Sequence, residues 1–257
     1  MRRAVDLNCD CGEGFGPYAL GDDAAMLDVV SSASVACGFH AGDPQIMAET
    51  FAAAARKGVA LGAHPGYPDL WGFGRRPQRF TLSEIERLCA YQIGAAQGVA
   101  ALAGTRVLYV KPHGALSNLA MAETDVARAL ARAVRAVDAR LGFLAVAASA
   151  LEREARALGL PTAAEIYADR GYGEDGLLAP RGAPGAVLCG ARRIAERAAT
   201  MVEEGAIVTL SGRRIPTAID SVCVHGDHPE AVEAARLLRR RLEAAGVSVR
   251  PFAVPAA

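Results

Sequence analysis

The chain contains 257 residues, of which 52% are hydrophobic and 22% charged, and its 28 basic residues balance its 28 acidic ones. This length suits one large domain, so we expect a single catalytic domain over residues 1–257. Zero net charge without a run of one sign argues against nucleic acid or a membrane surface as a partner, and no charge-free apolar stretch reaches the roughly 18 residues of a membrane span.

Short apolar runs alternate with longer amphipathic stretches along the whole chain. The expected strands are Ala4–Asp10, Ser34–His40, Val59–His64, Val107–His113, Gly142–Ala148, Thr162–Ala168 and Ser221–His225. The expected helices span residues 44–56, 82–103, 122–138, 150–158, 189–204 and 229–245. Uninterrupted apolar strands are typical of a parallel sheet that is covered on both faces. Between Ala206 and Thr217 we expect an added β-hairpin that turns at Ser211-Gly212.

The positions of the polar residues favour one of the two architectures that alternating strands and helices allow, an open doubly wound sheet and a closed barrel. Nearly every expected strand ends in, contains or precedes such a residue. These residues are Asp10, His40, His64, Lys111, His113, Glu165, Asp169, Arg170 and His225. An open sheet gathers its ligand groups on a few strands, whereas all strand ends of a barrel converge on one mouth. We therefore predict an α/β fold, a (β/α) barrel with seven or eight mostly parallel strands.

Four of the five histidines, His40, His64, His113 and His225, stand at the ends of expected strands. A single histidine in such a place is most often a hydrogen-bonded core residue, but four in the same position indicate a site. Histidine titrates near neutral pH and binds metals, so this set suits hydrolysis.

Carboxylates accompany these histidines. Asp10 and Glu13 lie in a glycine-rich segment that also contains Asn8, where the chain can approach a ligand closely. Glu165, within its strand, is the other expected catalytic acid, and Asp169-Arg170 after it supplies either an internal ion pair or a ligand contact.

The segments that follow His40 and His225 resemble each other, because each has a Gly-Asp pair before a proline that starts a helix. Asp43 and Asp227 are the acids of these pairs. Each acid either caps its helix or belongs to a site at the helix N-terminus, where an anionic ligand would be favoured.

Lysine is rare in this chain, with Lys57 and Lys111 as its two instances, so a lysine at a strand end suggests chemistry that arginine cannot perform. Burial lowers the pKa of lysine readily, which would make Lys111 an acid, a base or an oxyanion partner. Arg75 and Arg76 lie in a long loop after the third expected strand, where they either grip a carboxylate or phosphate or form solvated surface.

Two common nucleotide-binding signatures are excluded. Residues 171–176 match G-x-G-x-x-G, but Leu-Leu-Ala-Pro follows in place of a helix, and G-x-x-x-x-G-K-[ST] is absent. ATP binding by this chain would therefore need another kind of site.

Six sequence blocks resemble the LamB/YcsF family. They are Leu-Asn-Cys-Asp-Cys-Gly-Glu-Gly-Phe-Gly, Ala-Cys-Gly-Phe-His-Ala-Gly-Asp-Pro, Gly-Ala-His-Pro-Gly-Tyr-Pro-Asp, Lys-Pro-His-Gly-Ala-Leu, Tyr-Ala-Asp-Arg-Gly-Tyr and Cys-Val-His-Gly-Asp, spread from residue 7 to 227. The resemblance implies a seven-stranded β/α barrel related to sugar deacetylases. It also implies the activity of a bacterial 5-oxoprolinase component, which opens 5-oxo-L-proline to L-glutamate with ATP as co-substrate and with subunits B and C as partners.

Under that reading we expect ATP to activate the lactam oxygen, with Lys111 and Arg75 or Arg76 holding negative charge and with Asp10 or Glu165, assisted by a histidine, activating water. His113 and Asp227 complete the expected catalytic set. Asn8, Asp43, Arg75, Arg76, Asp169 and Arg170 are the expected substrate contacts.

Two alternatives stay open. A metal-dependent amide hydrolase or deacetylase would hold a divalent metal such as Zn²⁺ on Asp10, His40 and His64. A non-catalytic subunit would only deliver substrate. Six cysteines without a C-x-x-C pair suit a reducing cytoplasm. The sequence leaves open whether ATP binds this chain or its partners, and whether the chain is a homo-oligomer.

Overall fold

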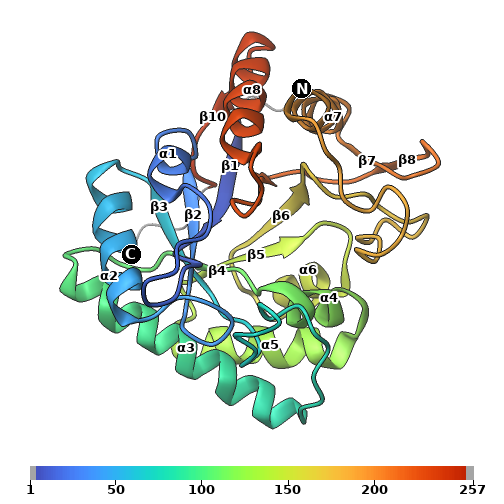
Figure 1. The fold of residues 1–257 in the computed structure, drawn as a ribbon. Helices are drawn as coiled ribbons and strands as arrows, with labels where there is room; N and C mark the ends of the chain where they lie inside the picture. The colour runs from blue at the N-terminus through green and yellow to red at the C-terminus, as the bar shows by residue number, and fades with distance from the viewer. Residues whose placement is uncertain (1–3, 253–257) are drawn as a thin grey trace.

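Seven parallel strands form a closed barrel at the centre of the molecule (Figure 1). The structure is a computed structural model that describes residues 4–252. The barrel strands are β1 (Ala4–Cys11), β2 (Ser32–Ala36), β3 (Ala60–His64), β4 (Tyr109–Val110), β5 (Gly142–Val146), β6 (Thr162–Tyr167) and β9 (Ser221–Cys223). Each pairs with the next in this order, and β9 pairs with β1, so the sheet has no free edge. The predicted barrel is confirmed.

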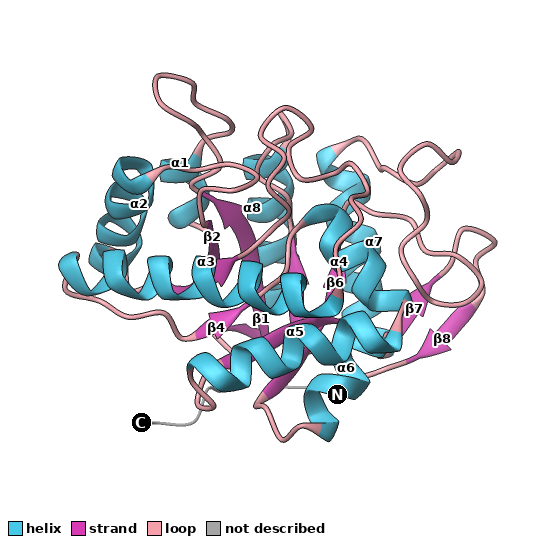
Figure 2. Cartoon of the chain, turned by 90° about the horizontal axis from the view of Figure 1, so that it is seen from below, coloured by secondary structure: helices cyan, strands magenta, loops and turns pink. Residues whose placement is uncertain are grey.

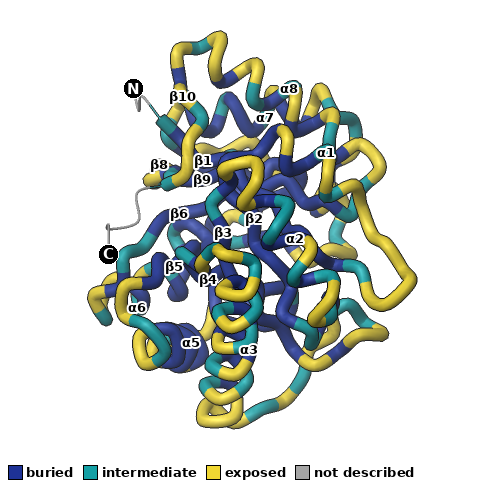
Figure 3. The backbone as a smooth tube through the Cα atoms, turned by 90° about the vertical axis from the view of Figure 1, so that its left-hand side faces the viewer, coloured by how far each residue is buried: buried dark blue, intermediate teal, exposed yellow. Residues whose placement is uncertain are grey.

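Helices cover the outside of the barrel (Figures 1 and 2). They are α1 (Asp23–Leu27), α2 (Pro44–Arg56), α3 (Leu82–Leu102), α4 (Gly114–Ala122), α5 (Thr124–Val137), α6 (Ala150–Ala157), α7 (Ala191–Glu204) and α8 (Ala231–Ala244). Six of them match the expected helices. The sequence missed α1 and α4, which are short, and α4 also begins at a glycine without a side-chain cap. The helices turn their buried sides toward the strands, and α3 alternates between buried and exposed positions (Figure 3).

Two small elements complete the fold. β7 (Ala206–Val208) and β8 (Arg214–Pro216) form the expected antiparallel hairpin. β10 (Ser248–Val249) pairs with the first residues of β1, outside the closed ring. Within residues 4–252, no helix combines the length and the apolar character that crossing a membrane requires.

Three of the strand ends that were expected to carry histidines are wrong. β2 ends at Ala36 and not at His40, β4 ends at Val110 and not at His113, and β9 ends at Cys223 and not at His225. Pro112 lacks a backbone N–H and cannot continue the ladder after Lys111. His40 and His113 therefore lie in the loops beyond their strands, whereas His64 is the last residue of β3.

Candidate active site

Polar side chains of β1 occupy the inside of the barrel. Asp6, Asn8 and Asp10 alternate along the strand with Leu7, Cys9 and Cys11, which join the hydrophobic core. Alternate residues of a strand face opposite sides, so the three polar chains share the inner face. The Asn8 amide donates 2.8 Å hydrogen bonds to Glu165 Oε1 and to Ser221 Oγ. The sequence analysis missed Asp6 and Ser221, although the period of two along β1 could have revealed Asp6.

Lys111 lies at the centre of this polar interior and is 1% exposed. Its Nζ lies 2.7 Å from Asp10 Oδ1, 3.2 Å from Glu165 Oε1 and 3.0 Å from Cys223 Sγ. Burial disfavours the charged form, but Asp10, Cys223 and Glu165 outweigh it and raise the pKa of Lys111 well above its usual value. The expected lowering of this pKa was wrong, because the sequence does not show how many acids surround the amine. Lys111 is a fixed cation.

Asp10 is held as a carboxylate by its neighbours. Burial works against ionisation, but His64 and Lys111 lower the pKa of Asp10 well below its usual range. Asp10 Oδ2 lies 3.4 Å from His64 Nε2, while Oδ1 accepts from Lys111. One oxygen is thus engaged in the interior, and the side chain also lines the cavity described below.

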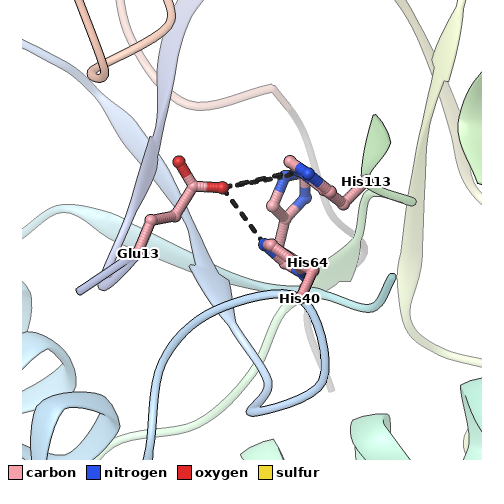
Figure 4. A group of neighbouring side chains, drawn as sticks. All are labelled: Glu13, His40, His64 and His113. Atoms are coloured by element: carbon pink, nitrogen blue, oxygen red, sulfur yellow. Dashed lines mark hydrogen bonds and ion pairs between the residues drawn. The ribbon is translucent and has the colours of Figure 1, made fainter. Parts of the chain in front are cut away.

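Glu13 and three imidazoles form a compact buried group (Figure 4). Glu13 Oε1 lies 3.1 Å from His40 Nε2, 3.4 Å from His113 Nδ1 and 3.9 Å from His64 Nε2. The rings of His40 and His113 stack with their centroids 3.7 Å apart. Burial, followed by the nearby charges of Asp10 and Asp227, raises the pKa of Glu13 well above its usual value.

The loop after β3 shapes this group through its backbone. Phe73 and Gly74 both have positive φ, 53° and 62°, and the Phe73 carbonyl accepts a 2.8 Å hydrogen bond from His113 Nε2. A Cβ on Gly74 would lie 2.6 Å from His40 Cβ and 2.9 Å from His113 Cδ2. A strained conformation of this kind is typical of functional loops. Only glycine fits against the two histidines at position 74.

His225 and Asp169 form a second pair. His225 Nδ1 lies 2.8 and 2.9 Å from the two Asp169 oxygens. Burial opposes ionisation of Asp169, but His225 lowers the pKa of this carboxyl. Because Nδ1 is engaged by Asp169, Nε2 is the ring atom left for a ligand, which is how a carboxylate orients a catalytic histidine.

A cavity of about 220 Å³ opens above these groups. Its lining includes Asp10, His64, His113, Tyr167, His225, Arg75, Arg170 and Arg181. Burial and repulsion from Arg75 and Arg170 lower the pKa of Arg181, so three guanidinium groups converge here. Such a cluster favours an anionic ligand. The sequence analysis did not name Arg181 or Tyr167 as site residues, although Tyr167 begins the Tyr-Ala-Asp-Arg-Gly-Tyr block.

The remaining expected site residues support the cavity or lie away from it. Asp227 accepts a 2.6 Å hydrogen bond from Arg75. The Arg170 side chain lines the cavity and also donates to the carbonyls of Ala179 and Ala186. Asp43 caps α2, accepting from the backbone of Gln45 and Ile46, so the capping interpretation of the sequence is confirmed. Arg76 pairs with Asp69 and is not among the cavity-lining residues, whereas Arg75 is.

Comparisons with known proteins agree along almost the whole chain. Residues 5–257 match the model of the LamB/YcsF family. A protein from Gluconobacter oxydans that is named as the A component of 5-oxoprolinase is 57% identical over 248 residues, which cover 96% of this chain and 98% of that protein. A protein of the same name from Azorhizobium caulinodans is also 57% identical, covering 97% of this chain and 99% of its own. The crystal structure of a lactam utilization protein from Thermus thermophilus is 42% identical, with a TM-score of 0.90 over 97% of this chain and 100% of that one.

Proposed function

The chain belongs to the LamB/YcsF family, and we propose on that basis that it is the A component of a 5-oxoprolinase. In this proposal it opens 5-oxo-L-proline to L-glutamate by hydrolysis, with ATP as co-substrate and with subunits B and C as partners. The observation that carries the proposal is the near-complete coverage of relatives with that name at 51–57% identity.

The cavity suits such a substrate in size and charge. Pockets for drug-sized ligands measure about 300–1,000 Å³, and this one measures about 220 Å³, which favours a smaller metabolite. The substrate is a small carboxylate with a lactam ring. We assign its carboxylate to Arg75 and Arg181 at the cavity wall and its ring to the side of Asp10 and His225.

The proposed chemistry uses the fixed charges of the site. A lactam is a stable amide, so its oxygen is first phosphorylated by ATP, with release of ADP. Asp10 then takes a proton from water as the water oxygen bonds to the ring carbon. Cleavage of the C–N bond follows, and His225, oriented by Asp169, donates a proton to the leaving nitrogen. The acyl phosphate that this cleavage leaves is hydrolysed by a second water to glutamate and phosphate. Lys111 does not line the cavity, so it acts through Asp10 by keeping this carboxylate charged.

Reconstitution tests the proposal. The purified chain is combined with the B and C subunits from the same source, and formation of glutamate and ADP is measured with and without 5-oxoproline. We expect coupled formation of both products only when all three subunits are present. Absence of 5-oxoproline-dependent turnover in the full mixture, or equal turnover without this chain, contradicts it.

A matched variant separates catalysis from substrate delivery. In the same mixture, His225→Gln should lower kcat by at least about 100-fold. His228→Gln, three residues away and not among the cavity-lining residues, should leave kcat unchanged. A delivery protein would tolerate both changes.

A further inference from the structure

The group formed by Glu13, His40, His64 and His113 contains two imidazole nitrogens that face each other without a proton to share. His64 Nδ1 lies 2.7 Å from the Lys111 carbonyl oxygen, and His113 Nε2 lies 2.8 Å from the Phe73 carbonyl oxygen. A carbonyl only accepts, so both of these nitrogens carry hydrogens. In the neutral rings the other two nitrogens, His64 Nε2 and His113 Nδ1, are then both lone-pair acceptors, and they lie 2.9 Å apart.

The nearest atoms of the neighbouring side chains are carboxyl oxygens. Glu13 Oε1 lies 3.4 Å from His113 Nδ1, and Asp10 Oδ2 lies 3.4 Å from His64 Nε2. All of these residues are buried. Two lone pairs that face each other in a buried place are stabilised by a cation between them, either a proton or a metal ion. Lys111 does not supply it, because its ammonium group is engaged by Asp10, Asn8, Cys223 and Glu165.

The distances between the donor atoms match those around a small tetrahedral cation. Metal–ligand bonds of about 2.0–2.1 Å place tetrahedral ligands about 3.3 Å from one another. The distances among His64 Nε2, His113 Nδ1, His40 Nε2 and Glu13 Oε1 include 2.9, 3.1, 3.4 and 3.9 Å, and all four atoms lie within 4.8 Å of one another. These distances lie on both sides of the ideal spacing.

The protein also orients the ligands from outside. The Lys111 and Phe73 carbonyls set the tautomers of His64 and His113, as second partners do for metal-binding histidines. His40 Nδ1 has no hydrogen-bond partner among residues 4–252, so His40 can present Nε2 with or without its proton. Three neutral imidazoles and one carboxylate form a ligand set that zinc accepts.

The other candidate cluster is less suitable. Asp10, Cys223 and His225 also bring donor atoms within 4.8 Å of one another. However, Lys111 Nζ lies 2.7 Å from Asp10 and 3.0 Å from Cys223, so a cation already occupies the position between two of the three ligands. The sequence had suggested Asp10, His40 and His64 as metal ligands. Because Lys111 already pairs with Asp10, we keep His40 and His64 and assign Glu13 and His113 in place of Asp10.

The geometry points to a binding site for one divalent transition-metal ion of the zinc type, held by Glu13, His40, His64 and His113. His64 and His113 line the cavity, so the ion would sit at its wall. When bound, such an ion supplies a Lewis acid next to the substrate position. The site goes beyond the proposed function, because it binds metal whether or not the chain opens a lactam.

Metal binding by the full-length chain tests this inference without substrate or partners. Protein stripped with a chelator and dialysed is titrated with Zn²⁺ in a calorimeter and with Co²⁺ in a spectrophotometer. We expect one equivalent of each ion to bind, with the strong visible absorption of tetrahedral cobalt. Loss of an outer hydrogen-bond partner alone commonly weakens metal binding about 10–100-fold, so Glu13→Gln and His64→Gln should each weaken it by at least about 100-fold.

A matched control identifies which cluster binds. Cys223→Ala removes a donor of the other cluster and should leave stoichiometry and affinity unchanged. Far-ultraviolet circular dichroism establishes that each variant is folded, and Glu13→Gln is the nearly isosteric change that keeps the test valid if a histidine variant does not fold. Failure of the wild-type chain to bind either ion, or equal binding by wild type and folded Glu13→Gln, overturns the inference.

Discussion

Lys57 and Lys111, the two lysines of the chain, occupy opposite environments. Lys57 lies on the surface with Asp28 and the Ala24 carbonyl, whereas Lys111 is buried among four polar side chains. The same amine is therefore a surface charge in one place and the cation that organises the site in the other. This pair provides an internal comparison for the role of Lys111.

We predict that Lys111→Met lowers kcat of the reconstituted enzyme by at least about 100-fold with little change in KM, because Asp10 loses its counter-ion while the cavity wall stays intact. Steady-state kinetics measure both parameters. Lys57→Met is the control and should behave as wild type. An equal effect of the two substitutions, or a rise in KM alone, would be inconsistent with this role.

Asp6 predicts a pH dependence of stability. Burial raises its pKa from 3.8 to about 6, despite hydrogen bonds from Ser221, Ser31 and Ser32. A raised carboxyl pKa means that the contribution of Asp6 is fully present below pH 3.8 and is lost as the pH rises through about 6. Two pKa units correspond to about 3 kcal/mol.

We therefore expect wild type to lose about 2–3 kcal/mol of unfolding free energy relative to Asp6→Asn between pH 4 and pH 7.5. Urea unfolding of both proteins at the two pH values measures this difference. Asp43→Asn is the control. Backbone hydrogen bonds from Ile46 and Gly16 lower the pKa of Asp43, so wild type should gain unfolding free energy relative to Asp43→Asn as the pH rises. A difference between wild type and Asp6→Asn that stays constant with pH would refute the assignment.

Arg75 and Arg76 are adjacent in sequence but separate in function. Arg75 lines the cavity and pairs with Asp227, while Arg76 pairs with Asp69. Arg75→Gln should raise KM for 5-oxoproline by about 10-fold or more, since a hydrogen bond to a charged group contributes about 1.5–3 kcal/mol. Arg76→Gln should leave KM within about twofold. Initial rates over a range of substrate concentrations give KM for both variants. A larger rise in KM for Arg76→Gln than for Arg75→Gln would exclude Arg75 as the substrate contact.

At the scale of elements, the loop between β3 and α3 positions the histidines of the site through its backbone more than through its side chains. Its Phe73 carbonyl orients His113, and its Gly74 lets the loop approach His40. The sequence indicated only a long loop that carries Arg75 and Arg76. The structure adds that the loop positions two histidines that belong to neither of its flanking elements, β3 and α3.

Gly74→Ala should disturb the site beyond the usual cost of a left-handed alanine, because the new Cβ meets His40 and His113. We expect at least a 10-fold loss of turnover and of Zn²⁺ affinity. Gly104→Ala is the matched control, with φ of 70° and no atom within 4 Å of the new Cβ. Gly104→Ala should lose about 1 kcal/mol of unfolding free energy and retain both turnover and Zn²⁺ affinity. Equal effects of the two variants would mean that strain alone explains them.

At the scale of the whole molecule, closure of the barrel brings together groups from both ends of the chain. The β1–β9 pairing sets Asn8 opposite Cys223 and lets its amide donate to Ser221 Oγ. The loop after β9 brings His225 to the cavity and Asp227 to Arg75. The four proposed metal ligands likewise come from three loops and the end of β3. Metal binding should therefore stabilise the folded chain as a unit.

We predict that Zn²⁺ at about 100 times its dissociation constant stabilises the chain by about 2.7 kcal/mol, which corresponds to a rise in Tm of roughly 5–10 °C for a protein of this size. Thermal unfolding followed by circular dichroism measures the shift. Cys223→Ala should show the same rise, and Glu13→Gln should not. A rise that survives in Glu13→Gln would place the stabilising ion elsewhere.

The sequence by itself determined the alternation of strands and helices, the parallel barrel and most of the residues at its mouth. These features follow from local patterns, because apolar runs, helix periodicity and polar strand ends are legible within short segments. Six of the expected helices, the hairpin and the gathering of Asp10, His64, Lys111 and Glu165 agree with the structure.

Only the tertiary structure decided which of these groups meet and in which charge state. The charge of Lys111 depends on acids from β1 and β6, and the partners of His113 depend on the positive φ of Phe73 in a distant loop. Electrostatic and hydrogen-bond effects act through space over a few ångströms, so residues far apart in sequence set them together. The pairing of Glu13 with three histidines, rather than Asp10 with two, is therefore a property of the closed barrel and its loops.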